Sequence, residues 1–187
     1  MNLSTAVIPK NASARERILL TAHTLFYRDG VRATGIDRVI AESKVAKVTF
    51  YRHFPSKNDL IREFLNYRHQ RWMAWFESTL QHHGANIDAL VPTLAQWFND
   101  KNFRGCAFIN SLGELNGLLP GIAQITREHK QDMTKAIARL LPKTQTHLAE
   151  AIALVVDGAI VRAQFEADPK ATLVAVEQAL QAWVKLR

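Results

Sequence analysis

Apolar residues recur at helical spacing along almost the whole chain, and no alternation with a period of two is long enough for a sheet. In the first segment, Ile18, Ala22, Leu25 and Phe26 lie three or four residues apart or side by side, which is typical of one helix face. The sequence therefore predicts an all-α protein with about nine helices. We expect these helices over residues 13–30, 34–44, 46–54, 57–81, 86–102, 106–116, 121–141, 144–167 and 169–186.

Polar residues mark where several of these helices begin. Ser13, Thr34 and Ser56 are each followed three residues later by an acidic side chain, which is the spacing of a helix N-cap. Gly30 stands where the first helix must end, in the usual place of a C-terminal glycine. We therefore expect side-chain caps at Ser13, Thr34 and Ser56.

The excess of positive charge lies in the first third of the chain. Residues 1–71 hold 13 Lys/Arg and 6 Asp/Glu, whereas residues 72–187 hold 11 of each, so the first segment carries the whole net charge of +7. Such an asymmetry indicates a segment that meets a polyanion. A solvated basic surface with no partner would have the same composition, so the residue pattern must decide.

The stretch from Thr34 to Leu60 predicts a helix-turn-helix. It reads TGIDRVIAESKVAKVTFYRHFPSKNDL, with a tight turn around residues 43–45 between two short helices. A helix-turn-helix places its second helix in the major groove of DNA. The outward positions of this second helix are small, basic or hydroxylated, and such side chains suit base edges and phosphates.

The same stretch resembles the DNA-binding domain of TetR-family (TetR/AcrR) transcriptional repressors. The spacing Y-x-H-F-x-x-K is the most specific part, and the helix before it is also similar to the first helix of the family. Beyond residue 70 only the layout of helices and the total length match. The matching residues of the motif are Thr34, Ile40, Ala41, Val45, Tyr51, His53, Phe54, Lys57 and Leu60.

This resemblance implies a homodimeric regulator that binds double-stranded DNA at a palindromic operator and is released by a small hydrophobic or amphipathic effector. It implies a flexible tail (1–12), a three-helix DNA-binding domain (13–56) and a helical effector-binding and dimerisation domain (57–187). By position, phosphates would be contacted by Thr34, Tyr51, His53 and Lys57. The groove would be lined by Lys47, Val48, Thr49 and Arg52.

Three positions of the helix-turn-helix depart from the family pattern. Lys44 replaces the turn glycine, and a lysine there costs about 1 kcal/mol if the position needs positive φ. Ala46 replaces a serine, so a polar N-cap for the recognition helix is missing. Val48 replaces a glycine, and its side chain either touches a thymine methyl or crowds the groove. Tyr51 as packed core and His53 as an ordinary surface residue remain alternatives to phosphate contacts.

The last two predicted helices carry more small and aliphatic residues than a lone helix pair can bury, which favours a homodimer built through them. The alternative is that these two helices form the central core of the protomer. Asp157 and Arg162 fall within the apolar part and would pair, face a pocket or lie at the interface. An effector pocket would use aromatic and a few polar groups. Its candidate lining residues are Trp72, Trp75, Phe76, Trp97, Phe98, Phe108, Asn110, Glu114, Met133 and Phe165.

Several classes of protein are excluded by what the sequence lacks. A single cysteine, Cys106, rules out an intramolecular disulfide, and its role as a redox sensor or a buried small residue is left open. Nucleophile, phosphate-loop and dinucleotide motifs are absent, so we expect no enzyme, no cofactor and no metal site. No apolar run is long enough to span a membrane, and we expect a cytoplasmic protein. The alternative function is a DNA-binding regulator controlled by a protein partner, with no small-molecule ligand.

Overall fold

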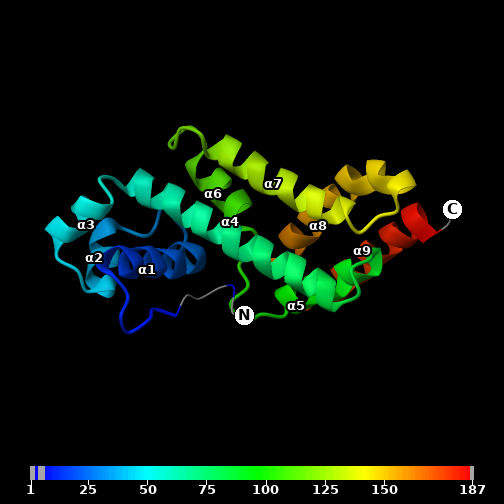
Figure 1. Ribbon diagram of the computed structural model, residues 1–187, viewed down its shortest axis with the longest axis horizontal. Helices are drawn as coiled ribbons and strands as arrows, with labels where there is room; N and C mark the ends of the chain where they lie inside the picture. Colours follow the sequence, from blue (N-terminus) through cyan, green and yellow to red (C-terminus); the bar gives the residue numbers. More distant parts are fainter. Residues whose placement is uncertain (1–2, 4–6, 186–187) are drawn as a thin grey trace. The chain divides into compact units, whose positions relative to one another are not determined.

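The computed structural model of the chain describes residues 3 and 7–185, and its regular elements there are all helical. The prediction of an all-α protein is confirmed (Figure 1). Short 3-10 segments η1 (Ile87–Ala89) and η2 (Lys143–Leu148) and a π-helical segment η3 (Gln181–Lys185) accompany the α-helices. The α-helices are α1 (Ala14–Asp29), α2 (Ile36–Ser43), α3 (Lys47–His53), α4 (Lys57–His82), α5 (Leu90–Phe98), α6 (Ala107–Leu115), α7 (Ile122–Ala138), α8 (Ala149–Ala163) and α9 (Lys170–Leu180).

Internal contacts divide the chain into two compact units. The first unit contains residues 1–72 and 107–126, and the second contains residues 73–106 and 127–187. The first unit thus holds α1 to α3, most of α4, α6 and the start of α7. The helix-turn-helix therefore shares its compact unit with a segment from the middle of the chain, which the sequence analysis assigned to the C-terminal domain.

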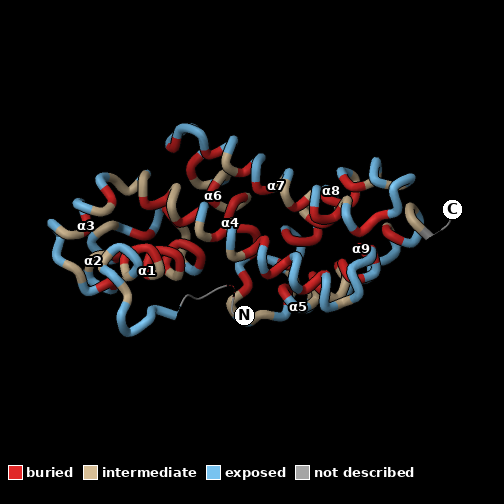
Figure 2. The backbone as a smooth tube through the Cα atoms, viewed as in Figure 1, coloured by how far each residue is buried: buried red, intermediate tan, exposed pale blue. Residues whose placement is uncertain are grey.

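Aromatic and aliphatic side chains from α1 to α4 fill the interior of the first unit. Phe26 of α1 meets Phe64 of α4 edge to face, with ring centroids 5.4 Å apart. Val39, Phe50 and Leu60 are completely buried. Figure 2 shows further buried stretches along α1. Full burial of a large apolar side chain contributes about 1.5–3 kcal/mol. Because α2 and α3 are too short to be stable alone, these contacts hold them in place.

The second unit has its own core. Trp75 near the end of α4 and Trp97 of α5 lie with ring centroids 6.2 Å apart. Helices α8 and α9 pack against each other, and Ile152 of α8 and Val176 of α9 are buried. Each unit therefore buries an apolar interior of its own.

The predicted caps at Ser13 and Ser56 are confirmed. The N–H of Ser13 donates to the Glu16 carboxylate at 2.8 Å, while the N–H of Glu16 donates to Ser13 Oγ at 3.3 Å. The N–H of Asp59 likewise donates to Ser56 Oγ at 3.2 Å. Ser13 and Glu16 thus form a reciprocal capping box, whereas Ser56 provides a side-chain cap alone, and both caps satisfy amide groups that the first helical turn leaves open.

The predicted cap at Thr34 is wrong. The residue that caps α2 is Gly35, and no side chain bonds to the free amides there. Thr34 is completely buried, and its hydroxyl donates to the carbonyl of Gly30 at 2.7 Å. The hydroxyl thus satisfies an exposed carbonyl at the end of α1, and Gly30 itself adopts a positive φ of 88°.

Helices in the C-terminal half are shorter than predicted. The segment 86–102 splits into η1 and α5. Helix α5 ends at Phe98, and the side-chain amide of the next residue, Asn99, donates to the Ala95 carbonyl at 2.8 Å. Segment 144–167 starts as η2, and α8 ends at Ala163; α7 and α9 also stop early. Of the predicted tail, residues 3 and 7–12 are non-helical, and the other tail residues and Leu186 lie outside the described residues.

Candidate nucleic-acid interface

Lys44 forms the turn of the helix-turn-helix in the left-handed backbone conformation. Its φ is 55° and its ψ is 45°, so the family's glycine position does need positive φ here. The N–H of Lys44 donates to the carbonyl of Ala41 at 3.2 Å, which ends α2. Arg17 of α1 donates from Nε to the carbonyl of Ser43 at 3.3 Å. The turn is thereby held by α1 despite a conformational cost of roughly 1 kcal/mol.

Phe50 fixes which face of α3 points outward. Its ring is completely buried and lies 5.2 Å from the Tyr51 ring and 6.2 Å from the Phe54 ring, centroid to centroid. At about 100° per residue, Val48 and Arg52 stand on the side of α3 opposite Phe50. These two side chains therefore lie at the centre of the outward face.

The other predicted DNA contacts flank this centre. Lys47 is exposed and forms a loose ion pair with Asp37 at 3.7 Å. Tyr51 is 41% exposed, whereas Thr49 and His53 are half-buried. Tyr51 is therefore not packed core. The N-cap of α3 is Ala46 without any side-chain cap, so the predicted lack of a polar cap is confirmed.

Lys57 and Thr34 differ in whether their side chains are available to donate a hydrogen bond to a phosphate. Lys57 is the first residue of α4, and its Nζ donates to the carbonyl of Arg32 at 3.5 Å. Partial burial lowers the pKa of Lys57, and the carboxylate of Glu114 acts in the opposite direction. Thr34, in contrast, is buried with its hydroxyl already donated. Its predicted phosphate contact does not fit this structure.

Glu114 of α6 is bound to the turn between α1 and α2. The N–H of Arg32 donates to its carboxylate at 2.7 Å. A side chain at Gly30 would bring its Cβ to 3.2 Å from Glu114 Oε1, so the glycine leaves room for the carboxylate. Glu114 was predicted to line an effector pocket. Its bond to the Arg32 turn could not be predicted, because no local pattern links residues 82 positions apart.

His23 of α1 is another polar group that the pattern did not reveal. Its ring is completely buried beside Phe64 and Tyr67, at centroid distances of 5.9 and 5.2 Å. Neither ring nitrogen has a hydrogen-bond partner among the described residues. Burial, and secondarily the charges of Arg68 and Arg71, lower the pKa of His23 from 6.5 to about 3. The imidazole is therefore neutral in the folded chain at pH 7.

The ten residues predicted to line an effector pocket do not all belong to one compact unit. Trp72, Phe108, Asn110 and Glu114 fall in the first unit and the other six in the second. The aromatic members other than Phe165 are buried, as is Met133. Phe165 is 72% exposed and lies beyond the end of α8. The set therefore divides into buried aromatic core in both units and one exposed ring.

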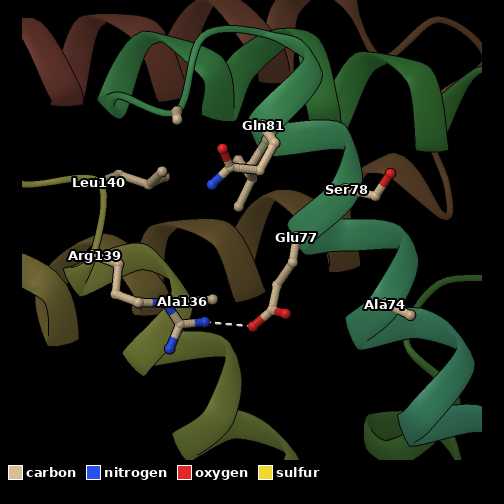
Figure 3. A pocket seen from close by; sticks show the side chains of 9 residues that line it. Ala74, Glu77, Ser78, Gln81, Ala136, Arg139 and Leu140 are labelled. Carbon is tan, nitrogen blue, oxygen red and sulfur yellow. Dashed lines mark hydrogen bonds and ion pairs between the residues drawn. The ribbon is translucent and has the colours of Figure 1, made fainter.

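A cavity of about 620 Å³ lies in the second unit between the end of α4 and the end of α7 (Figure 3). Glu77 and Arg139 form an ion pair across it, and the side chain of Gln81 points into the same space. None of the ten predicted residues lines it. Its lining residues are Ala74, Glu77, Ser78, Leu80, Gln81, Ala85, Ala136, Arg139 and Leu140.

The single cysteine lies near a half-buried ion pair of the second unit. Cys106 is buried, and the nearby Lys130 bonds to the Asp157 carboxylate at 2.5 Å. Burial alone would lower the pKa of Lys130, but the sulfur of Cys106 and the carboxylate of Asp157 raise it. Asp157 thus pairs with Lys130, while Arg162 pairs with Glu166 at 3.0 Å. Of the arrangements considered from the sequence, direct pairing of Asp157 with Arg162 is wrong.

Within residues 3 and 7–185, the His, Cys, Asp and Glu side chains form no group of three or more that would hold a metal ion. None of the helices in that part of the chain combines the length and the apolar character needed to cross a bilayer.

The helix-turn-helix is similar in sequence to a known family. The family model described as "Bacterial regulatory proteins, tetR family" matches residues 18–64. An uncharacterized HTH-type transcriptional regulator, YuxN of Bacillus subtilis (strain 168), is 34% identical over 58 residues. That match covers 30% of this chain and 20% of the relative, so it spans about a fifth of the relative's length.

Solved structures extend the similarity to nearly the whole chain. The TetR-family transcriptional regulator SCO4454 of Streptomyces coelicolor is 27% identical, with a TM-score of 0.81 over 92% of this chain and 90% of that one. A TetR-family regulator of Cytophaga hutchinsonii has a TM-score of 0.79 at 15% identity, covering 96% and 98% of the two chains. The reduced form of Escherichia coli NemR has a TM-score of 0.75 at 18% identity, covering 89% and 96%. The latter two likenesses concern the fold alone.

Proposed function

We propose that this chain is a member of the TetR family of bacterial regulatory proteins, whose family model matches residues 18–64, and that it is a repressor which binds a palindromic operator as a homodimer. Membership in this family would make it a DNA-binding transcriptional regulator and not an enzyme. Repression, the symmetry of the operator and release by a small effector are the finer parts of the proposal. The cytoplasmic location stays a prediction.

The observation that carries the proposal is the outward face of α3. Phe50 anchors the helix to the core, so the opposite side presents Val48 and Arg52 to a groove. Lys47 and Tyr51 flank them on one side. The surplus of positive charge in residues 1–71 favours binding of a polyanion. This arrangement suits a helix that enters the major groove.

We assign phosphate contacts to side chains around the edge of this face. Tyr51 and His53 at the end of α3, and Lys57 at the start of α4, would each reach a phosphate oxygen. Lys47, Val48, Thr49 and Arg52 would line the groove. The buried Thr34 is left out of the assignment because its hydroxyl is committed to Gly30.

A homodimer is supported by apolar side chains that the second unit leaves in water. Leu154 is 67% exposed on α8, and Val161 and Phe165 follow it seven and eleven residues later, also exposed. Val174 of α9 is exposed as well. Such spacing places Leu154 and Val161 on one stripe of α8, and Phe165 follows just beyond the end of the helix. A twofold mate would cover this stripe and set two recognition helices about one turn of DNA apart.

The effector that we propose binds in the second unit. The cavity at the end of α4 leaves room for a small molecule in the second unit, and aromatic side chains are abundant there. A hydrophobic or amphipathic ligand would act by favouring a conformation that binds the operator poorly. The alternative is a regulator released by a protein partner.

The test is selection of genomic DNA fragments by the purified full-length chain, followed by footprinting of the best fragment. A short palindrome protected symmetrically, together with a dimer in sedimentation equilibrium, is the expected result. Weak binding that depends on salt but not on sequence would overturn the proposal. Release of the fragment by a protein-free cell extract would support a small effector, and release only by the protein fraction would support the alternative.

A further inference from the structure

Val48 is an aliphatic side chain at the centre of an otherwise polar face. It is 67% exposed. Its exposed neighbours on α3 are Lys47, Tyr51 and Arg52, and each of these carries a hydrogen-bond donor. A single exposed valine on a protein surface is ordinary and needs no explanation. Val48, however, lies on the side of α3 opposite the buried Phe50 and among basic residues, and this position indicates a role in binding.

We propose that Val48 selects thymine at one position of each operator half-site by packing against the C5-methyl group. The inference rests on the proposed function, because it requires that α3 enters the major groove. An isopropyl group neither donates nor accepts a hydrogen bond. In the major groove the C5-methyl of thymine is the apolar group that it can contact, whereas the other base edges present donors and acceptors.

The selection has an attractive and a repulsive part. Covering one methyl group removes apolar surface from water, which corresponds to about a fourfold gain in affinity for each half-site. A cytosine or guanine edge in the same place would lose water from a polar group without gaining a partner, and such a loss is larger still. Thymine is therefore favoured by contact, and its competitors are disfavoured by desolvation.

The charges around Val48 argue for DNA as the occupant of this face. Helix α3 contains no acidic residue and ends in Arg52 and His53. Lys44 in the preceding turn is also exposed. A protein surface that covered Val48 would need acidic groups to neutralise these cations. The phosphate backbone on either side of a DNA groove supplies that negative charge directly.

Deoxyuridine scanning tests the inference, because deoxyuridine differs from thymidine only by the missing methyl group. Each thymine of the selected half-site is replaced in turn, symmetrically in both half-sites, and the affinity of the full-length dimer is measured. We expect one position where the loss is about fourfold per half-site, and about 15-fold for both. In Val48→Ala the loss of affinity on deoxyuridine substitution should vanish. Lys47→Ala should weaken binding to all duplexes but retain the same sensitivity to deoxyuridine.

A second base substitution tests whether adding a methyl group restores affinity. Replacing the critical T·A pair by C·G should weaken binding by the natural chain, and 5-methylcytosine in that position should recover about fourfold in affinity per half-site. Val48→Ala should show no such recovery. Thermal unfolding of Val48→Ala should match that of the natural chain, because the side chain is exposed. A palindrome in which no thymine is sensitive, or whose sensitivity persists in Val48→Ala, overturns the inference and leaves the proposed function intact. Absence of any sequence-specific site overturns both.

Discussion

Helices α3 and α8 both hold apolar side chains in water, but their surroundings differ. On α3, Val48 stands beside Arg52 and Lys47. On α8, Leu154 and Val161 form an exposed apolar stripe, which Phe165 continues just beyond the end of the helix. An isolated apolar group among cations fits a polyanion that carries a methyl group, whereas a stripe fits another apolar surface. The chemistry around an exposed side chain, more than its exposure, therefore indicates the partner.

The largest effect is expected from charges placed in the α8 stripe. In Leu154→Glu/Phe165→Glu each carboxylate would be buried without a partner in the dimer, which costs several kcal/mol. The dimer dissociation constant should rise by at least about a thousandfold. Sedimentation equilibrium measures this change. Gln131→Glu, which adds one charge at an exposed position of α7, is the control and should leave the dimer intact.

An unchanged dimer in the double variant would contradict the role of the stripe. Circular dichroism should show that the variant keeps its helices, because both altered side chains are exposed in the protomer. Operator affinity should fall with dimerisation, since a single short recognition helix contributes only half of the site.

Smaller effects are expected on α3 and α4, where they separate base contacts from phosphate contacts. Arg52→Ala should weaken operator binding by roughly 10- to 100-fold and relax the preference at one base pair. Lys57→Ala should weaken binding to all sequences alike and reduce the salt slope by about one unit per half-site. Affinities for the selected operator and for a scrambled duplex, measured between low and high salt, check both. An equal loss on both duplexes for Arg52→Ala would make it a phosphate contact.

The local features of the chain were predictable, whereas the long-range ones were not. The side-chain caps at Ser13 and Ser56 use partners three residues away, so spacing alone indicates them. The hydroxyl of Thr34 turns inward instead, because it has a carbonyl at the end of α1 within reach. The bond from Arg32 to Glu114 joins residues that only the tertiary fold brings together. For the same reason the sequence did not separate exposed Phe165 from buried Phe108.

Acid should destabilise the first unit through His23. Its pKa is near 3 in the folded chain and near 6.5 when unfolded, so below pH 6.5 the unfolded chain binds a proton that the folded chain does not. The free energy of unfolding should fall by about 1.4 kcal/mol per pH unit there, or about 2 kcal/mol between pH 7.5 and 5. Urea unfolding at the two pH values should show this loss in the natural chain and in His147→Leu. In His23→Leu it should disappear, and a loss of the same size there would assign the acid sensitivity to other groups.

The smallest effect is expected from glycine substitutions in two turns, one in each unit. Lys44 and Ala85 are the non-glycine residues described with positive φ, and both have a φ of 55°. Glycine at either site removes the strain of the left-handed conformation and adds freedom to the unfolded chain, so each substitution should stabilise by about 0.5–1 kcal/mol. Urea unfolding of Lys44→Gly and Ala85→Gly measures this gain. Only Lys44→Gly should also weaken operator binding at low salt, because it removes a charge beside α3. A drop in operator affinity for Ala85→Gly of the same size would mean that turn geometry, and not the charge of Lys44, governs binding.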